Sequence, residues 1–280
     1  MTIDFHTHIF PPRIKEHREE YLRRDAGFAE LYSSPTARII TAEELISSMD
    51  SENIAAAVVL NIGWRSHQLC IETNDYIMES AARYPGRLYG FCALQPMAAG
   101  AITELERCIR GGIRGIGELR PDSQGFDLGS LPLMSNIAEL AEEHNLCLLT
   151  HASEPVGHQY SGKGKTTPDI IYQFAMNFPR VHFICAHWGG GLPFYALMPE
   201  VAAVLKNTYF DTAASPFLYQ PDIYEYIANI IGSDKILFGS DYPLLPQSRV
   251  ILQIQRARLT EDAKNAILTN NAQKLLHLIS

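Results

Sequence analysis

Short runs of apolar residues recur along the chain, and each pair is separated by enough residues to form a helix. Eight of these runs show little alternation between apolar and polar positions, which is typical of strands buried on both faces. They cover residues 2–8, 54–62, 87–95, 112–118, 145–151, 180–187, 207–213 and 235–241. Strands of this kind that alternate with helices predict a parallel sheet.

The segments between the runs have helical patterns. The clearest begins at the capping box Thr41-Ala42-Glu43-Glu44 and runs to about Asn53. The other predicted helices cover 72–84, 98–110, 131–144, 167–178, 192–205, 220–231 and 260–279. Eight strands, each followed by a helix, predict a closed (β/α)8 TIM barrel, and a doubly wound open sheet is the structural alternative. The barrel is favoured because it brings the ends of strands 1, 4, 5, 6 and 8 around one centre.

Two segments that follow strands are unusually long for connections in a compact domain. The first thirty residues of segment 9–53 contain Pro11, Pro12 and a charged run from Lys15 to Arg24, and segment 152–168 is rich in glycine and polar residues. We predict both as loops, either functional or flexible. In a barrel, segments that follow strands lie over the catalytic mouth.

Composition is consistent with this fold and excludes some functions. A chain of 280 residues is close to the usual length of a single α/β barrel, so we predict one domain over residues 1–280. A hydrophobic fraction of 46% and a charged fraction of 19% are typical of a soluble protein with a large core. The net charge of −8 disfavours nucleic acid and anionic lipid as partners, which leaves a small-molecule substrate.

The cysteines and the absence of targeting signals suggest a compartment. Five cysteines are scattered, and Cys92, Cys147 and Cys185 lie within strand patterns, as expected for reduced core thiols of a cytosolic protein. We see no basic and apolar leader before Asp4 and no run of eighteen apolar residues, so we expect neither export nor membrane insertion. The expected location is the cytoplasm. The oligomeric state stays open, a homodimer included.

Candidate metal ligands stand at the ends of five predicted strands. His6 and His8 are separated by one residue on a strand, so their imidazoles point the same way. Ten histidines in a chain of this length produce about 0.4 such pairs by chance, so the pair indicates a metal site only together with other candidate ligands. The other candidate ligands are Glu118, His151, His187 and Asp241.

These residue types point to a catalytic metal. Imidazole nitrogens with a carboxylate suit Zn²⁺, and three or four protein ligands with one open position form a catalytic site. We therefore predict a divalent cofactor, Zn²⁺ with Mn²⁺ or another divalent ion as the alternative, held by His6, His8, His151 and Asp241.

The remaining two candidates leave alternatives open. Glu118 is placed to bridge a second ion, but a buried carboxylate can equally pair with Arg114 or Arg120 and serve the fold. His187 is expected either to ligate that second ion or to act on the substrate. The number of ions, one or two, stays open.

The chain resembles the amidohydrolase superfamily, in the amidohydrolase-related branch that includes aminocarboxymuconate-semialdehyde decarboxylase. The resemblance spans almost the whole chain and lies in Asp4-Phe5-His6-Thr7-His8, Thr150-His151, Ala186-His187-Trp188-Gly189-Gly190-Gly191-Leu192-Pro193, Phe238-Gly239-Ser240-Asp241-Tyr242-Pro243 and Asn271-Ala272-Gln273-Lys274-Leu275-Leu276.

The resemblance implies a metal-dependent TIM barrel and assigns roles to matching positions. His6, His8, His151 and Asp241 would bind the metal, His187 would assist the reaction and Asp241 would move the proton. Decarboxylases of this branch generally use one zinc ion. Glu118 departs from that pattern, because a glutamate ending strand 4 is typical of the two-metal hydrolases of the superfamily.

Three functions are compatible with this ligand set. The expected one is hydrolysis of an ester, lactone or amide by metal-activated water, with Asp241 as general base and His187 stabilising the oxyanion or the leaving group. The alternative is decarboxylation of an unsaturated or aromatic acid. A metal-stabilised protein without turnover is disfavoured, because six converging polar groups are costly to bury without chemical use.

The substrate is expected to be a small organic acid. Arg65 and Arg120 follow predicted strands 2 and 4, where a guanidinium can grip a carboxylate with two hydrogen bonds. Lys163 and Lys165 lie in the loop after strand 5 and are either further anchors or simply solvated, and Trp188 is a further candidate substrate contact.

Overall fold

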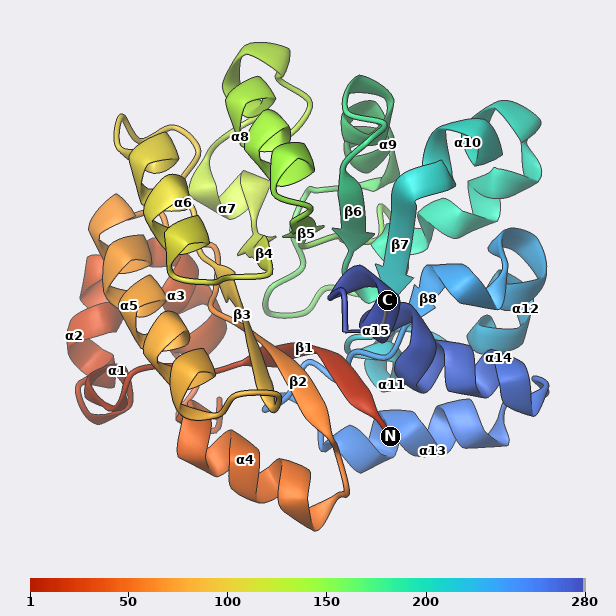
Figure 1. Cartoon of the computed structure of the whole chain (residues 1–280), viewed down its shortest axis with the longest axis horizontal. Coiled ribbons are helices and arrows are strands. Elements are labelled where there is room, and N and C mark those ends of the chain that lie inside the picture. Colours follow the sequence, from red (N-terminus) through yellow and green to blue (C-terminus); the bar gives the residue numbers. More distant parts are fainter. Residues whose placement is uncertain (279–280) are drawn as a thin grey trace.

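The computed structural model describes residues 1–278 and shows eight parallel strands surrounded by helices (Figure 1). Each strand pairs with its neighbours in sequence order from β1 to β8. Backbone hydrogen bonds from Phe5 N to Phe238 O and from His8 N to Tyr242 O, both 2.7 Å, join the first strand to the last segment of the sheet. This confirms the predicted barrel. The strands are β1 (Ile3–His8), β2 (Ala56–Leu60), β3 (Leu88–Cys92), β4 (Gly115–Leu119), β5 (Cys147–Thr150), β6 (His182–Cys185), β7 (Thr208–Asp211) and β8 (Ile236–Leu237).

Most predicted helices are present in the outer layer (Figure 1). The capping box is formed at α4 (Ala42–Ser51), where Thr41 Oγ1 accepts from Glu44 N and the Glu44 carboxylate accepts from Thr41 N. These reciprocal bonds satisfy two backbone donors that a helix start otherwise leaves unpaired. The other long helices are α5 (His67–Arg83), α6 (Ala101–Arg110), α8 (Leu131–Glu143), α9 (Pro168–Asn177), α12 (Ile223–Ile231) and α13 (Gln247–Arg256), the last not predicted.

The prediction of a long loop after the first strand is wrong. Segment 9–53 contains three short helices before α4, namely α1 (Pro12–Glu16), α2 (Arg18–Arg24) and α3 (Ala26–Tyr32). They are fastened by an aromatic cluster in which Phe28 stacks on Trp64 with ring centroids 5.3 Å apart. Helices of five to seven residues show too few turns for a hydrophobic period to appear. Tertiary packing of their aromatic side chains stabilises these helices, and the local sequence pattern does not reveal such packing.

One predicted helix is interrupted, and another is continuous but contains a π-helical turn. The segment predicted as 192–205 is η1 (His187–Leu197), then α10 (Pro199–Val204) and η2 (Leu205–Asn207), because prolines at 193 and 199 remove backbone donors. The segment predicted as 260–279 is α14 (Glu261–Asn265), η4 (Ala266–Asn270) and α15 (Asn271–Leu275), and residue 279 lies outside the described residues. Short elements absent from the prediction are α7 (Pro121–Gln124), α11 (Ser215–Leu218) and η3 (Ser233–Lys235).

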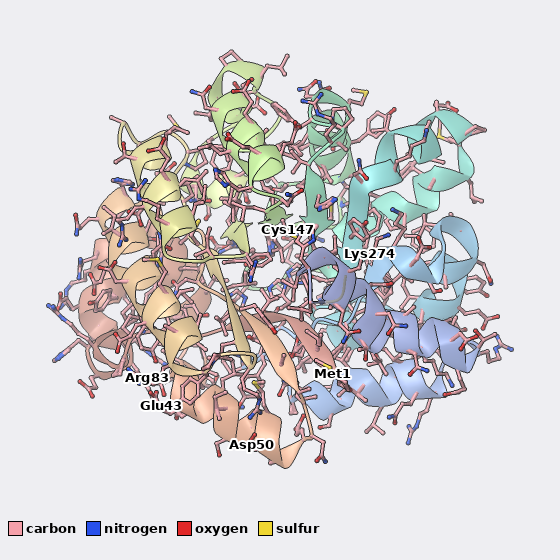
Figure 2. All side chains as sticks on the ribbon, viewed as in Figure 1. Met1, Glu43, Asp50, Arg83, Cys147 and Lys274 are labelled. Carbon is pink, nitrogen blue, oxygen red and sulfur yellow. The ribbon has the colours of Figure 1, made fainter. Side chains whose placement is uncertain are left out.

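The core has two layers on either side of the sheet. The larger cluster lies between strands and helices, and the smaller one fills the barrel interior with side chains that include Phe5, Val58, Leu149 and Leu237. α15 contacts β1 and β8 and covers the barrel opening at the amino ends of the strands, which is called the lower end below. Figure 2 places buried Cys147 near the barrel centre. All five cysteines are buried and free. Within residues 1–278, no helix is both long and apolar enough to cross a membrane.

Candidate metal centre

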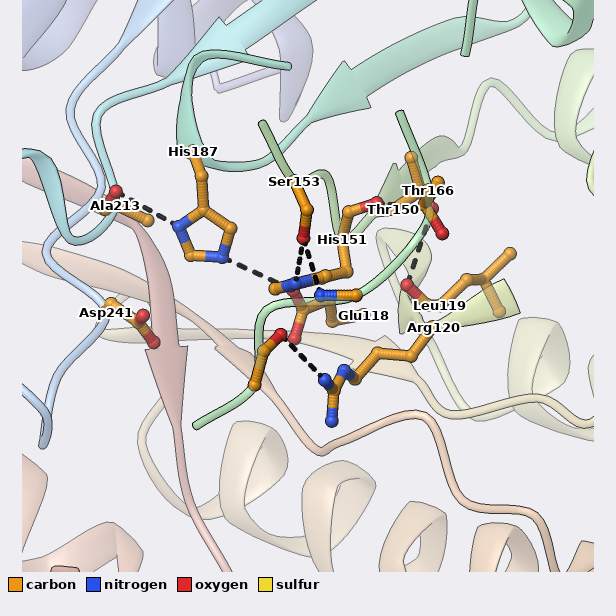
Figure 3. Close-up of polar contacts among 12 residues, drawn as sticks. Glu118, Leu119, Arg120, Thr150, His151, Ser153, Thr166, His187, Ala213 and Asp241 are labelled. Atoms are coloured by element: carbon orange, nitrogen blue, oxygen red, sulfur yellow. Dashed lines mark hydrogen bonds and ion pairs between the residues drawn. The ribbon is translucent and has the colours of Figure 1, made fainter. Parts of the chain in front are cut away.

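Six polar side chains meet at the carboxyl ends of the barrel strands, where Figure 3 shows four of them. They form two groups, each with ligand atoms within 4.8 Å of one another. The first group is His6, His8 and Asp241, and the second is Glu118, His151 and His187. His6 and His8 belong to β1 and Glu118 to β4, whereas the other three residues follow β5, β6 and β8 directly. The barrel thus brings together every predicted metal-site residue.

The first group has the spacing of ligands around one ion. His6 Nε2 lies 3.0 Å from His8 Nε2, and Asp241 Oδ1 lies 3.3 Å from His8 Nε2 and 3.8 Å from His6 Nε2. Ligands bound tetrahedrally at about 2.0–2.2 Å are separated by roughly 3.4 Å. The three atoms therefore fit a divalent ion.

Hydrogen bonding leaves the correct nitrogen of His6 free for that ion. Asp211 Oδ2 lies 2.8 Å from His6 Nδ1, and a carboxylate only accepts, so Nδ1 carries the proton and Nε2 turns its lone pair toward His8. Asp211 Oδ1 also accepts from His187 N at 3.0 Å. A carboxylate behind a ligating imidazole fixes its orientation and its tautomer.

The second group is arranged around the Glu118 carboxylate. Its Oε1 lies 2.9 Å from His151 Nδ1 and 3.8 Å from His187 Nε2, and its Oε2 lies 3.9 Å from His8 Nε2. Glu118 therefore faces histidines of both groups, and it forms no ion pair with Arg114 or Arg120 within residues 1–278. The structural alternative for this carboxylate has no support in these contacts. The sequence predicted that His151 shares an ion with His6, His8 and Asp241. The structure instead places His151 in the group of Glu118 and His187.

The site is electrostatically suited to a cation. Burial alone would raise the pKa of Glu118 and Asp241, but the neighbouring imidazoles outweigh it and hold both pKa values below their usual range. Burial alone would lower the pKa of His6, but Asp211, Asp241 and Glu118 raise it to about 10. Burial lowers the pKa of His151 despite Glu118. Carboxylates held ionised beside basic imidazoles make a site where a divalent ion replaces protons favourably.

The backbone is unusual where two of the side chains emerge. His187 and Asp241 have φ angles of 55° and 64°, a left-handed conformation that non-glycine residues rarely adopt. Gly190 follows in the same turn with φ 60°, and a Cβ there would lie 2.3 Å from Ser153 O. Glycine at this position therefore lets the turn after β6 pack against the segment after β5. Residues 189–191 do not line the pocket described next, so the glycines serve the turn.

A pocket of about 410 Å³ opens above the two groups. Its floor includes His8, Glu118, His151, His187 and Asp241. Its walls are largely apolar or aromatic and come from segments after several strands, namely Leu31, Tyr32, Ala37, Ile62, Ala214, Phe217, Leu218, Pro243 and Leu244. Polar wall groups come from Arg38, Arg120, His158, Tyr160 and Ser161. Such a mostly apolar pocket suits a small organic molecule.

The predicted substrate contacts do not all reach this pocket. Arg120 lines it, but Arg65 is exposed and lies outside it because its segment turns toward Asp25, which accepts from Arg65 N at 2.8 Å. Trp188 is also outside, since its fully buried indole donates to Ser215 Oγ and packs against Tyr224 at 5.3 Å. Trp188 is thus a core residue under the mouth.

The two loop lysines also lie outside the pocket. Lys163 Nζ donates to Val156 O at 2.7 Å and to His158 O at 3.0 Å, so it ties the loop to itself. Lys165 is held through its backbone N, which donates to Asp122 Oδ2 at 2.8 Å. Their predicted role as anchors has no support in this placement, and the loop itself contributes His158, Tyr160, Ser161 and Gly162 to the pocket.

Sequence reasoning missed several residues of the site, among them Tyr32, Arg38 and Asp211. Asp211 ends β7 and bonds to His6, Arg38 comes from the segment before α4, and Tyr32 ends α3. Asp211 had a signal, because it is an acidic residue in a predicted strand of the barrel. Arg38 and Tyr32 had none, because only packing brings segment 9–53 to the mouth.

Comparison with known proteins identifies the family. The amidohydrolase family model matches residues 3–278. The chain belongs to the amidohydrolase family. This confirms the resemblance seen in the sequence. The matched region contains all six residues of the two ligand groups.

Known relatives of this amidohydrolase-family protein align along most of their length. The 2-amino-3-carboxymuconate-6-semialdehyde decarboxylase of Dictyostelium discoideum is 23% identical, with 99% of this chain and 92% of the relative aligned. The 2-keto-4-carboxy-3-hexenedioate hydratase of Sphingobium sp. is 25% identical, with 86% and 83% aligned. The 5-carboxyvanillate decarboxylase of Novosphingobium aromaticivorans, crystallised with bound manganese, superposes with a TM-score of 0.82 at 16% identity over 99% and 97% of the two chains. At that identity the superposition shows the fold alone.

Proposed function

We propose that this amidohydrolase-family protein is a divalent-metal-dependent decarboxylase of a small unsaturated or aromatic carboxylic acid. The observation that carries the proposal is the group of His6, His8 and Asp241, spaced for one ion at the floor of a mostly apolar pocket. The names of the two relatives matched by sequence support it, because one is a decarboxylase and the other is a hydratase of an unsaturated carboxylic acid. Mn²⁺ is the first ion to test, with Zn²⁺ as the alternative.

Decarboxylation requires an electron sink and a proton donor. When bound, the divalent ion would polarise a carbonyl or hydroxyl oxygen of the substrate and so stabilise the electron pair left by departing CO₂. The apolar walls offer few hydrogen bonds to a substrate carboxylate, which weakens its solvation relative to bulk water. The leaving carboxylate becomes neutral CO₂, and the carbon that held it must receive a proton.

His187 is the side chain placed to deliver that proton. Ala213 O lies 3.1 Å from His187 Nδ1 and can only accept, so Nδ1 carries a proton and Nε2 faces the pocket. When Nε2 is also protonated, it can transfer its proton to the substrate carbon. Asp241 is unsuited to donate because its pKa lies below the usual range, so it remains ionised and can accept a hydrogen bond from a substrate hydroxyl.

The test is CO₂ release from metal-loaded protein offered a panel of aromatic and unsaturated acids, including 2,6-dihydroxybenzoate. We expect His187→Asn to lower CO₂ release by about 100-fold or more while one metal equivalent is retained. His144→Asn is the control, since His144 is an exposed histidine at the end of α8. Hydrolysis of esters, lactones or amides without CO₂ release from any acid would overturn the proposal.

Hydrolysis through two ions is a second candidate, because Glu118 faces histidines of both groups. In this case Glu118 would hold the second ion with His151 and His187, and water bound there would serve as nucleophile. Elemental analysis of wild-type protein and Glu118→Gln separates the candidates. Two metal equivalents that fall to one in the variant, together with loss of hydrolysis, would favour this candidate. One equivalent in both proteins would favour decarboxylation.

A further inference from the structure

Asp4 is a fully buried carboxylate next to the metal centre, and its hydrogen-bond partners are uncharged donors. Its Oδ1 accepts from His6 N at 3.2 Å and from Ser240 N at 3.0 Å. Its Oδ2 accepts from Ser240 Oγ at 2.5 Å and from Gln247 Nε2 at 2.7 Å. A carboxylate is costly to bury unless donors surround it, so these bonds hold Asp4 in one position.

The Asp4 side chain points away from the barrel interior. Ile3 and Phe5, on either side of it in β1, both belong to the cluster inside the barrel. Asp4 instead reaches α13, because Gln247 is the first residue of that helix. The carboxylate therefore joins three parts of the fold, namely β1, the segment after β8 and α13.

The partners of Asp4 lie at both ends of a segment that builds the mouth. Ser240 directly precedes this segment, residues 241–246, and Gln247 directly follows it. The segment contains the ligand Asp241, and two further residues of it line the pocket. Asp4 thus fastens one ligand and part of the pocket wall to β1, the strand of the two histidines of the first group.

The backbone at Asp241 requires such support. Its φ of 64° is a left-handed conformation, which a non-glycine residue keeps only where its surroundings fix it. On one side, Asp4 holds Ser240 through both its backbone N and its Oγ. On the other side, Tyr242 N donates to the same Ser240 Oγ at 2.9 Å. Because Asp241 N also donates to His6 O at 3.0 Å, these bonds tie the turn of one ligand to the strand of another.

Attachment of α13 alone does not explain this arrangement. That role requires only the bond from Gln247, whereas the other three bonds to Asp4 come from His6 and Ser240. His6 is a ligand of the first group, and Ser240 adjoins another, Asp241. Most of the bonds therefore fix the backbone from which ligands project.

We propose that Asp4 is a positioning residue of the metal centre, which sets the separation of His6 and Asp241 by joining the backbone segments that carry them. Asp4 acts through these segments and is not itself a ligand. The proposal rests on the ion proposed at His6, His8 and Asp241, and it holds for decarboxylation and hydrolysis alike. Loss of Asp4 should change both the affinity and the geometry of the ion site.

Asp4→Leu tests the proposal, because leucine has nearly the shape of aspartate but accepts no hydrogen bond. We expect Mn²⁺ affinity, measured by competition with a chelator, to fall by about 10- to 100-fold, as is typical when a residue that orients a ligand is lost. The visible absorption of Co²⁺ bound in the same site should also change, because it reports coordination geometry. Asp4→Asn should recover most of both properties, because an amide oxygen can still accept from His6 N and Ser240 N.

Glu104→Leu is the matched control, since it removes a buried carboxylate that accepts from Asn74 and Arg107 and belongs to neither ligand group. It should lower the urea concentration at which the protein unfolds and leave Mn²⁺ affinity and Co²⁺ absorption unchanged. If Asp4→Leu does not fold, Ser240→Ala replaces it. Removal of this hydroxyl should weaken Mn²⁺ affinity by about 2- to 10-fold and change the Co²⁺ absorption.

Two results would overturn the positioning role. One is wild-type Mn²⁺ affinity and Co²⁺ absorption in folded Asp4→Leu or, in its place, in Ser240→Ala. The other is an equal loss of affinity in Glu104→Leu, which would trace the effect to general destabilisation. The CO₂ assay tests the proposed function separately: wild-type protein that binds the ion without releasing CO₂ would retain the role of Asp4 and reject decarboxylation, whereas wild-type protein that binds no ion would overturn both.

Discussion

The two ends of the barrel interior have opposite chemistry although the same strands build both. The lower end is filled by apolar side chains that include Phe5 and Leu149, whereas the mouth holds the two ligand groups. On β1, Phe5 enters the lower cluster and the next residue, His6, belongs to the mouth. The end with the apolar side chains contributes mainly hydrophobic stabilisation, whereas the mouth carries buried ionisable side chains.

The two ends meet at irregularities in the sheet. Pairing of β1 with β2 shifts register between Asp4 and Thr7, and pairing of β4 with β5 shifts between Ile116 and Leu119. A register shift changes which residues of a strand face inward. The shifts coincide with His6 and Glu118, so both strands change from packing to ligand positions there.

The largest expected effect comes from removing a ligand at the mouth. His8→Ala should lose its metal equivalent and lower turnover by about 1,000-fold or more, because His8 Nε2 is close to every other ligand of its group. The metal-free variant should keep the far-UV circular dichroism of metal-free wild type, which separates loss of a ligand from loss of the fold. Full metal content in His8→Ala would contradict the assignment of this group.

The opposite behaviour is expected at the lower end. Leu149→Ala should lower the free energy of unfolding by about 2–5 kcal/mol, because it leaves a cavity in a fully buried cluster. The folded variant should bind one metal equivalent with wild-type affinity. Urea unfolding and metal titration measure the two quantities. A variant that lost metal affinity while remaining folded would show that the two ends are coupled.

A smaller effect is expected from the residue behind the mouth. Asp211→Asn should weaken metal affinity by about 10- to 100-fold, because an amide can present a donor where His6 Nδ1 needs an acceptor. Competition with a chelator measures the affinity. Asp222→Asn on the exposed surface is the matched control. Equal affinities of Asp211→Asn and wild type would remove Asp211 from the metal centre.

The smallest effect concerns a buried carboxylate far from any ligand group. Burial would raise the pKa of Glu104, but hydrogen bonds from Arg107 and Asn74 outweigh it and lower the pKa. Folding therefore favours the ionised form, and this stability is present above the unfolded pKa and lost as pH falls below it.

Glu104→Gln should accordingly flatten the dependence of stability on pH below about 4.5. Urea unfolding at a series of pH values, with and without Mn²⁺, measures it. Unlike substitutions at the mouth, this one should leave metal affinity unchanged. An unaltered acid dependence would show that Glu104 is not linked to folding.

Local patterns in the sequence predicted much of the fold and many residues of the candidate site. Buried strands and capping signals predicted the barrel, and strand ends predicted all six residues of the two groups. The predicted substrate contacts, which were chosen only because they follow strands, were placed less accurately. Arg65, Lys163 and Lys165 follow strands, yet their side chains do not line the pocket, because a position in a loop does not fix where its side chain points.

By itself, the sequence determined the order of strands and helices and the ligand chemistry at the strand ends, because burial and hydrogen bonding act over a few neighbouring residues. Tertiary structure decided what depends on contacts between distant segments. It placed α3 and Arg38 at the mouth, put Asp211 behind His6, and grouped His151 with Glu118. It also left Arg120 Nη1 buried without a partner among residues 1–278, since that depends on how α3 and the loop after β5 pack around one guanidinium.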